Sequence, residues 1–221
     1  MEQDLEHDPE GRAGGGYRRS TGTKRGEARR RDLLDRVIRD VAVNGLVDFS
    51  LRRAARAADT THKVLLYHFD GVDDLLRQVV VELRGRRIDG ALAAAQGPEH
   101  ASLADRVRSM WPVLTSDDSG QLALDQAIGL AMYDADRYGE LGRGSSALYL
   151  PALLSICPEE WSDRRKQEVA SMVLAVLRGF LVHWRTGGSL DGVETGFAAL
   201  VRALEREQAA DEPFADGPSV D

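Results

Sequence analysis

The sequence has little of what extracellular and membrane proteins need. Cys157 is the single cysteine among 221 residues, so an internal disulfide is excluded, as is common in the reducing cytoplasm. Apolar runs stay well short of the roughly 20 residues that span a bilayer. The first ten residues are acidic rather than basic and apolar, unlike a secretion signal. We expect a cytoplasmic protein without membrane contact.

The residue patterns of catalytic and metal sites are also missing. Cys157 is followed by Pro158 and has no identifiable base, which argues against a nucleophile. The five histidines show no metal-ligand spacing. Asp73-Asp74 fits the start of a helix, and Asp117-Asp118 fits a solvated loop. No strand pattern or glycine-rich phosphate loop is present, so we expect no enzyme, no metal and no cofactor.

The charge is unevenly divided along the chain. The net charge is −7, with 43% hydrophobic and 29% charged residues, a composition typical of a soluble globular protein. Residues 12–88 hold 18 basic and 10 acidic side chains, whereas residues 89–221 hold 11 and 21. A solvated surface explains charge but not this segregation. The basic N-terminal part is suited to bind nucleic acid.

Residues 49–69 have the pattern of two short helices joined by a tight turn. Ser50 is a suitable cap for the first helix, expected over residues 50–58, and Thr60 or Thr61 for the second, over residues 61–69. Leu65 and Phe69 lie four residues apart and would face inward, leaving His62, Lys63 and Tyr67 outward. This arrangement is that of a helix-turn-helix with a recognition helix for the major groove. On the pattern alone, an ordinary helical hairpin fits equally well.

The flanking residues extend the pattern into a recognisable domain. They include Gly45 after the first helix, Phe49-Ser50, the alanine-rich second helix, Leu65, His68-Phe69 and Leu75-Leu76. In order and spacing, residues 31–80 resemble the DNA-binding domain of the TetR family of transcriptional regulators. The resemblance implies that double-stranded DNA is a partner. The DNA-binding residues that we predict are Ser50, Arg52, Arg53, Thr60, Thr61, His62, Lys63, Tyr67 and His68.

Three positions depart from the family pattern. The family usually has glycine at the position of Asp59, tyrosine at that of Leu66 and lysine at that of Val72. Leucine has no hydroxyl and valine has no charge, so two phosphate contacts do not carry over. We expect Tyr67, His68 and the N-terminal arginines to replace them.

The remaining chain shows helical periodicity alone, so the expected fold class is all-α. Helices are predicted over residues 27–44, 72–95, 102–115, 121–133, 145–156 with an interruption at Pro151, 161–186 and 190–207. We divide the chain into a disordered arm over residues 1–26, a helix-turn-helix domain over 27–71, a helical ligand-binding and dimerisation domain over 72–208, and a disordered tail over 209–221. Arg18-Arg19 and Lys24-Arg25 in the arm are expected to lie along the backbone or minor groove of DNA, and the alternative is a solvated tail.

The last two long helices carry wide apolar stripes. The resemblance implies that such helices from two subunits form a four-helix bundle, so we predict a homodimer. Its predicted interface residues are Val169, Met172, Val173, Val176, Leu177, Phe180, Phe197, Leu200, Val201 and Leu204. The alternative is that these stripes fill the core of one subunit.

Several large apolar and aromatic residues are candidates for a ligand pocket between the helices. They are Met110, Trp111, Met132, Tyr133, Tyr149, His183 and Trp184. The alternative is that aromatic residues and methionines at helical spacing belong to the core.

These patterns and the resemblance together predict a ligand-responsive regulator. We expect a repressor that binds a palindromic operator as a dimer and is released by a small apolar effector. The helix over residues 72–95 would transmit the change, since it starts beside the recognition helix. The alternatives are an activator of the same fold, and a helical dimer that binds another protein and not DNA.

Overall fold

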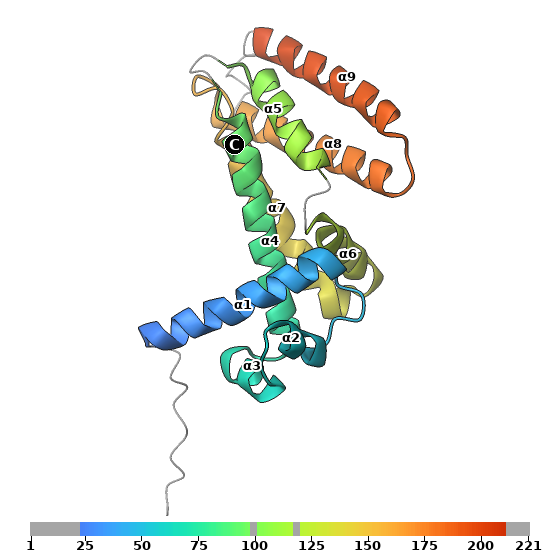
Figure 1. The fold of residues 1–221 in the computed structure, drawn as a ribbon. Coiled ribbons are helices and arrows are strands. Elements are labelled where there is room, and N and C mark those ends of the chain that lie inside the picture. Colours follow the sequence, from blue (N-terminus) through green and yellow to red (C-terminus); the bar gives the residue numbers. More distant parts are fainter. Residues whose placement is uncertain (1–22, 98–100, 117–119, 211–221) are drawn as a thin grey trace, which may run out of the picture.

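The computed structural model describes residues 23–97, 101–116 and 120–210. These residues form nine helices and no strands, as the all-α prediction requires (Figure 1). The helices are α1 (Lys24–Asn44), α2 (Leu51–Ala57), α3 (His62–His68), α4 (Val72–Ala95), α5 (Leu103–Thr115), α6 (Gln121–Tyr133), α7 (Ala135–Leu154), α8 (Asp163–Arg185) and α9 (Leu190–Ala209).

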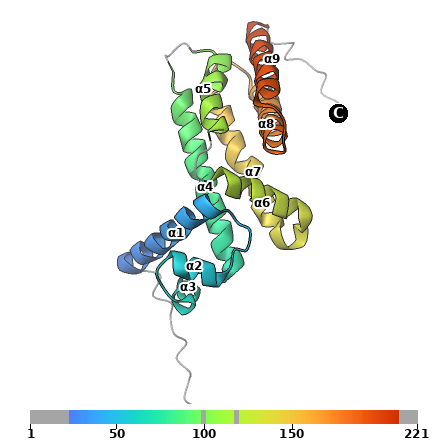
Figure 2. The ribbon, with the colours of Figure 1, turned by 45° about the vertical axis from the view of Figure 1, so that its right-hand side comes forward.

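Helices α1 to α3 gather at one end of the molecule, and α8 and α9 lie at the other (Figures 1 and 2). Helix α4 runs the length between them, with α6 and α7 beside its middle. Among the described residues, no helix has both the length and the apolar character required to cross a membrane.

One core, here called the N-terminal core, holds the helix-turn-helix together. Leu33 and Val37 of α1, Ala54 of α2 and Leu65 of α3 are fully buried in it. The alanines of α2 have short side chains, so α1 and α3 pack close to its backbone. The first half of α4 and part of α6 belong to the same core, through residues such as Val79 and Ala127. Packing therefore continues across the predicted domain boundary at residue 71.

The C-terminal core joins the second half of α4 to α5, α7, α8 and α9. At its centre the Trp111 indole stacks on the Phe197 ring, with centroids 4.3 Å apart and planes 11° from parallel. The Phe180 ring meets the same indole edge-on at 6.2 Å. Gly196 permits this contact, because a Cβ there would lie 2.7 Å from the Phe180 ring.

Two helices begin at least three residues before their predicted starts, and the first of them includes Lys24-Arg25 of the predicted arm. Helix α1 begins three residues early, at Lys24, because the Thr23 hydroxyl accepts a hydrogen bond from the Gly26 N–H at 3.1 Å. Helix α7 begins ten residues early, at Ala135, where the Asp134 carboxylate accepts from Arg137 N–H at 3.1 Å. It also continues through Pro151, where an interruption was expected. The arginines Arg18-Arg19 of the predicted arm, and the predicted tail after Ala210, lie outside the described residues.

Candidate nucleic-acid interface and ligand cavity

The turn between α2 and α3 sets the angle of the second helix. Asp59 has φ of +49°, the left-handed conformation that usually selects glycine. The Thr60 N–H donates to the Ala55 carbonyl at 2.9 Å, closing the end of α2. Thr61 then caps α3 by accepting from the Val64 N–H at 3.4 Å. Asp59 therefore adopts the left-handed conformation at a position where the TetR-family pattern usually has glycine.

Helix α3 presents a short exposed face. Leu65 and Phe69 are buried, as predicted, and hold the helix against α1 and α2. His62, Lys63 and Leu66 are exposed, and Leu66 is 46% accessible although it is apolar. Tyr67 is half-buried and meets His68 edge-on at 5.0 Å between ring centroids.

The predicted DNA-binding residues fall into two groups. Ser50, Arg52, Thr61, His62 and Lys63 are exposed, whereas Arg53, Thr60, Tyr67 and His68 are half-buried. The hydroxyls of Ser50 and Thr61 already cap their helices, accepting N–H groups at 3.3 and 3.4 Å.

Arg53 is held inside the domain. Its Nε lies 2.7 Å from Oδ2 of Asp40, and its Nη1 and Nη2 donate to the carbonyls of Val47 and Gly45 at 3.0 and 2.8 Å. It therefore ties α1, α2 and their connecting loop together.

His68 lies at the end of α3, against α1. Its Nδ1 is buried and has no hydrogen-bond partner in the described part of the chain. Burial lowers the pKa of His68, and the positive charges of Arg29 and Arg30 lower it further. Arg30 also donates to the His68 carbonyl at 3.2 Å and lies 4.9 Å from the centre of the Phe69 ring. Arg30 thus fixes the end of the recognition helix.

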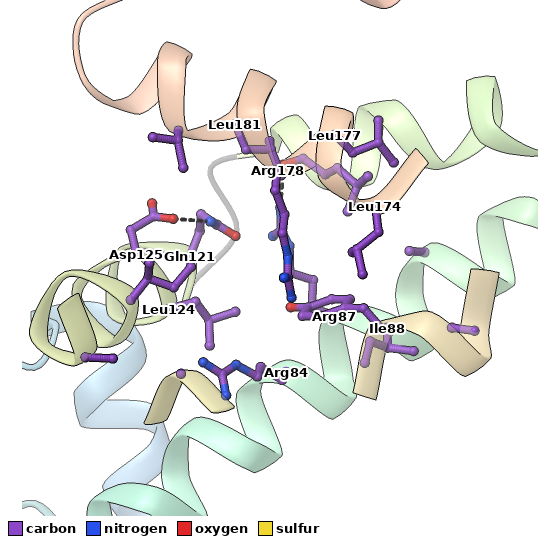
Figure 3. A pocket seen from close by; sticks show the side chains of 18 of the residues that line it. Arg84, Arg87, Ile88, Gln121, Leu124, Asp125, Leu174, Leu177, Arg178 and Leu181 are labelled. Atoms are coloured by element: carbon purple, nitrogen blue, oxygen red, sulfur yellow. Dashed lines mark hydrogen bonds between the residues drawn. The ribbon is translucent and has the colours of Figure 1, made fainter. Parts of the chain in front are cut away.

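A cavity of about 480 Å³, here called the central cavity, lies between α4, α5, α6, α7 and α8. It is located where the N-terminal and C-terminal cores meet, because residues of both line it. Most of its wall is apolar. Representative wall residues are Ile88, Leu124, Leu174, Leu177 and Leu181 (Figure 3).

Three arginines interrupt this apolar wall. Arg84 and Arg87 come from α4 and Arg178 from α8. Arg84 is only 2% exposed and donates from Nη2 to the Leu141 carbonyl, and Arg87 donates to the carbonyl of Leu114. Burial lowers the pKa of both Arg84 and Arg178. The Arg178 guanidinium lies 5.4 Å from the centre of the Tyr149 ring.

The other polar groups of the central cavity come mainly from α6. Gln121 donates from Nε2 to Oδ1 of Asp125 at 2.6 Å, and Arg185 Nε lies 3.4 Å from Oδ2 of the same carboxylate. Burial raises the pKa of Asp125 despite these partners. The Gln121 side-chain oxygen is buried and accepts no hydrogen bond from any residue that the structure describes. Burial also raises the pKa of Tyr149, whose hydroxyl therefore stays neutral at pH 7.

Three of the seven predicted ligand-binding residues line the central cavity: Met110, Met132 and Tyr149. Met132 lies at its rim, being 82% exposed. The polar residues of the cavity wall were not among the predicted ligand-binding residues: Arg84, Arg87, Arg178, Gln121 and Asp125.

The other four predicted ligand-binding residues lie elsewhere. Trp111 is enclosed by α8 and α9 through its contacts with Phe180 and Phe197. Tyr133 is 88% exposed at the end of α6, His183 is exposed, and Trp184 packs on the C-terminal core. For Trp111 and Trp184 the alternative of core packing describes the structure.

The predicted dimer residues are mostly buried within one subunit. Val169, Val173, Leu177, Phe197, Leu200, Val201 and Leu204 are at most 7% exposed, because α8 and α9 pack on each other and on α5. Val176 and Phe180 are half-buried against the same core, and Met172 is 41% exposed. The outer side of α8 instead carries Met172, Ala175 and Gly179, all exposed.

Two features considered in the sequence, the lone cysteine and the possibility of a metal site, have a defined place in the structure. Cys157 is buried and its Sγ lies 3.4 Å from the Leu153 carbonyl; burial raises the pKa of its thiol, so it is a poor nucleophile. No cluster of three or more metal-ligating side chains occurs within residues 23–97, 101–116 and 120–210.

Solved structures of bacterial regulators share this arrangement of helices. A putative TetR-family regulator from Rhodococcus sp. has a TM-score of 0.62 at 18% identity, covering 81% of this chain and 98% of that one. A TetR-family regulator from Cytophaga hutchinsonii has a TM-score of 0.66 at 14% identity, covering 83% and 96%. The multidrug binding protein EbrR, solved with imidazole, has a TM-score of 0.60 at 19% identity, covering 85% and 97%.

No protein-family model and no curated protein matches the sequence of the chain. At these identities the likeness concerns the fold. The protein has the fold of TetR-family transcriptional regulators, as the resemblance of residues 31–80 predicted.

Proposed function

We propose that this protein is a sequence-specific DNA-binding regulator of transcription whose affinity for DNA changes when a small molecule enters the central cavity. The course of α4 is the observation that supports this most. Residues Leu75 to Leu83 pack in the core of the helix-turn-helix, and Arg84, Arg87 and Ile88 of the same helix line the cavity. A ligand that moves α4 must therefore also move the recognition helix.

Helix α3 is proposed to enter the major groove. The exposed Lys63 and Arg52 carry charges suited to phosphates, and counterion release makes such contacts favourable. The exposed Leu66 would contact the methyl group of thymine, the apolar feature of the major groove. Because Arg53 is committed to Asp40, we assign it to positioning α2 rather than to DNA.

Two copies are needed for such a protein to read a long site, because one recognition helix reaches few bases. We propose a homodimer formed through the outer side of α8, around Met172, Ala175 and Gly179. Small side chains there allow helices of two subunits to approach closely. The buried residues of α8 and α9 that were predicted as interface would instead pack behind this face, within the subunit.

Two helices are proposed to connect the central cavity with the DNA-binding end. One is α4. The other is α6, on which Leu124 and Asp125 line the cavity while Gln126 accepts a hydrogen bond from the Leu46 N–H, in the loop after α1. A ligand that favours one position of these helices would respace the two recognition helices. We propose a repressor that leaves a palindromic operator when its effector binds.

Selection of bound DNA from a random pool, with the full chain, tests this function. The affinity for the selected DNA should fall steeply as salt rises. Replacing Lys63 with alanine should weaken binding and reduce the salt slope by about one. The matched control is Arg164→Ala, which removes a positive charge from α8, where its side chain is 87% exposed. No sequence-selective binding at low salt would refute the proposal in favour of a protein-binding dimer.

A further inference from the structure

We infer that the central cavity binds an amphipathic anion, with an apolar body of about ten carbon atoms and one carboxylate held by Arg84, Arg87 and Arg178. The inference names the class of effector for the function proposed above. It rests on that function only for its biological meaning, because binding to the cavity is measurable without DNA.

Positive charge predominates on the cavity wall. Among the lining residues that the structure describes, the ionisable side chains are three arginines, Asp125 and Tyr149. The Asp125 carboxylate already faces Gln121 and Arg185, at 2.6 and 3.4 Å. The positive charges of Arg185, on α8, and of Arg87 both act on this carboxylate, so one negative charge faces the three arginines of the wall. A cationic ligand would meet repulsion from three guanidinium groups.

The three arginines converge on one part of the cavity. The charges of Arg87, Arg84 and Arg178 all act on the Tyr149 hydroxyl, which marks the place that they share. The positive charge of Arg178 also opposes that of Arg84, which is 2% exposed. An anion placed beside these guanidinium groups is attracted by all three of them. Guanidinium groups match carboxylates through paired N–H donors.

A second observation points to a ligand independently of charge. Gln121 is 7% exposed, and its side-chain oxygen has no hydrogen-bond donor among the described residues. Figure 3 shows this oxygen turned away from Asp125, and Gln121 lines the cavity. A buried acceptor left unpaired costs about 1–3 kcal/mol, so a guest that carries a hydroxyl besides its carboxylate would gain a hydrogen bond here that decanoate does not supply.

The size and the apolar wall define the rest of the ligand. A volume of about 480 Å³ lies in the usual range for small-molecule sites, about 300–1,000 Å³. At about 30 Å³ per heavy atom, the share of a water molecule in the liquid, it holds on the order of 15 atoms. The remaining wall is mostly apolar, with residues such as Leu124 of α6 and Leu174 and Leu181 of α8, and suits an alkyl or aryl body.

Isothermal titration of the full-length protein with three ten-carbon probes tests the inference. Decanoate supplies the anion, decanol removes the charge, and decylammonium reverses it. Decanoate should bind at least tenfold more tightly than decanol, and decylammonium should not bind. Decyl phosphate separates a requirement for a carboxylate from a requirement for any anion. Equal binding of decanoate, decanol and decylammonium, or tighter binding of decylammonium, would overturn the inference.

Two neighbouring arginines of α4 provide matched variants. Arg87→Met should weaken decanoate binding at least tenfold and leave decanol binding unchanged, whereas Arg87→Lys should recover part of the loss. Arg86→Met is the control, because Arg86 faces outward, is 49% exposed, and pairs with Asp35 and Glu82. Thermal unfolding reports whether each variant folds. A folded Arg87→Met protein that binds decanoate as the wild type does would contradict the assignment.

This test and the test of DNA binding fail separately. If decanoate binds but no DNA is selected, the charge of the cavity is as inferred and the proposed regulator is wrong. If DNA is selected but decylammonium is the probe that binds, the regulator stands and the ligand class is wrong.

Discussion

Replacing Asp40 with leucine and Arg53 with methionine, singly and together, measures the ion pair that ties α1 to α2. The side chains of Arg53 and Asp40 are 15% and 21% exposed, and their charged atoms lie 2.7 Å apart. Exposed pairs contribute about 0.2–1 kcal/mol, and breaking a buried pair costs about 3–5 kcal/mol. For this half-buried pair we expect Asp40→Leu to lower the free energy of unfolding by about 2 kcal/mol.

Arg53→Met should be the more damaging change. It removes the ion pair and also the two hydrogen bonds to the carbonyls of Val47 and Gly45. We expect a loss of about 3 kcal/mol, because hydrogen bonds from charged donors are worth about 1.5–3 kcal/mol each and loop relaxation recovers part. The double variant should lose less than the sum of the single losses, by about 1–2 kcal/mol.

Urea unfolding of the four proteins gives these values, provided that the slope with urea stays constant. DNA binding is then compared under conditions where every variant is folded. Both single variants should bind DNA like the wild type. Two results would refute the reasoning: a coupling energy below about 0.5 kcal/mol, or a folded Arg53→Met protein that loses DNA binding while Asp40→Leu retains it. The second would make Arg53 a DNA contact, as the sequence pattern first suggested.

Three further outcomes follow from single positions. Asp59→Gly should raise the free energy of unfolding by about 0.5 kcal/mol in a urea titration, because glycine adopts φ of +49° without steric cost. Asp59→Val should lower the free energy of unfolding. Similar stability of the two variants would contradict the strained turn. Gly179→Glu should give a folded monomer in light scattering, because a Cβ at this position meets no atom of the subunit within 4 Å. The matched variant Gly85→Glu, on α4, should stay dimeric. A dimer of Gly179→Glu would place the interface elsewhere. The pKa of His68 is lowered on folding, so its contribution to stability is complete above the ordinary pKa of 6.5 and is lost as the pH falls below that value. His68→Gln should flatten this pH dependence of the free energy of unfolding in urea titrations between pH 5 and 8. An unchanged pH dependence would assign the effect to another group.

The helix-turn-helix was predictable because its determinants are local. Ser50 and Thr61 cap α2 and α3 as their positions indicated, and Leu65 and Phe69 are 0% and 2% exposed. The start of α7 was not predictable in this way. Its glycines have low helix propensity, and the structure shows a tertiary reason for one of them: a Cβ at Gly142 would lie 3.0 Å from that of Ala131 in α6.

Periodicity shows which residues are buried but not what buries them. The stripes of α8 and α9 were read as a subunit interface, whereas Val173 and Leu204 are covered within the subunit. The cavity arginines did leave a signal. Arg84 follows Val80 by four residues and Arg178 follows Leu174 by four, so each charge continues an apolar stripe. A charged residue in such a place indicates a buried polar site.

The contact between Gln126 and Leu46 gives the sharpest test of how the cavity reaches DNA. Gln126 follows Asp125 on α6, and its side-chain oxygen accepts the N–H of Leu46, which is 3% exposed. A Cβ at Gly45 would lie 2.5 Å from the same oxygen, so the loop closes tightly on α6. A ligand that displaces α6 must strain or break this hydrogen bond.

The energy of that bond limits the coupling that it carries. An unpaired buried N–H costs about 1–3 kcal/mol, which corresponds to a change of about 5–150-fold in DNA affinity. Because coupling is reciprocal, selected DNA should weaken decanoate binding by the factor with which decanoate weakens DNA binding. Gln126→Leu should keep both separate affinities and reduce this factor. Equal decanoate affinity with and without DNA in the wild-type protein would rule out induction. An unchanged factor in Gln126→Leu would assign the coupling to α4 or α7, since both helices also have residues in the cavity wall and in the N-terminal core.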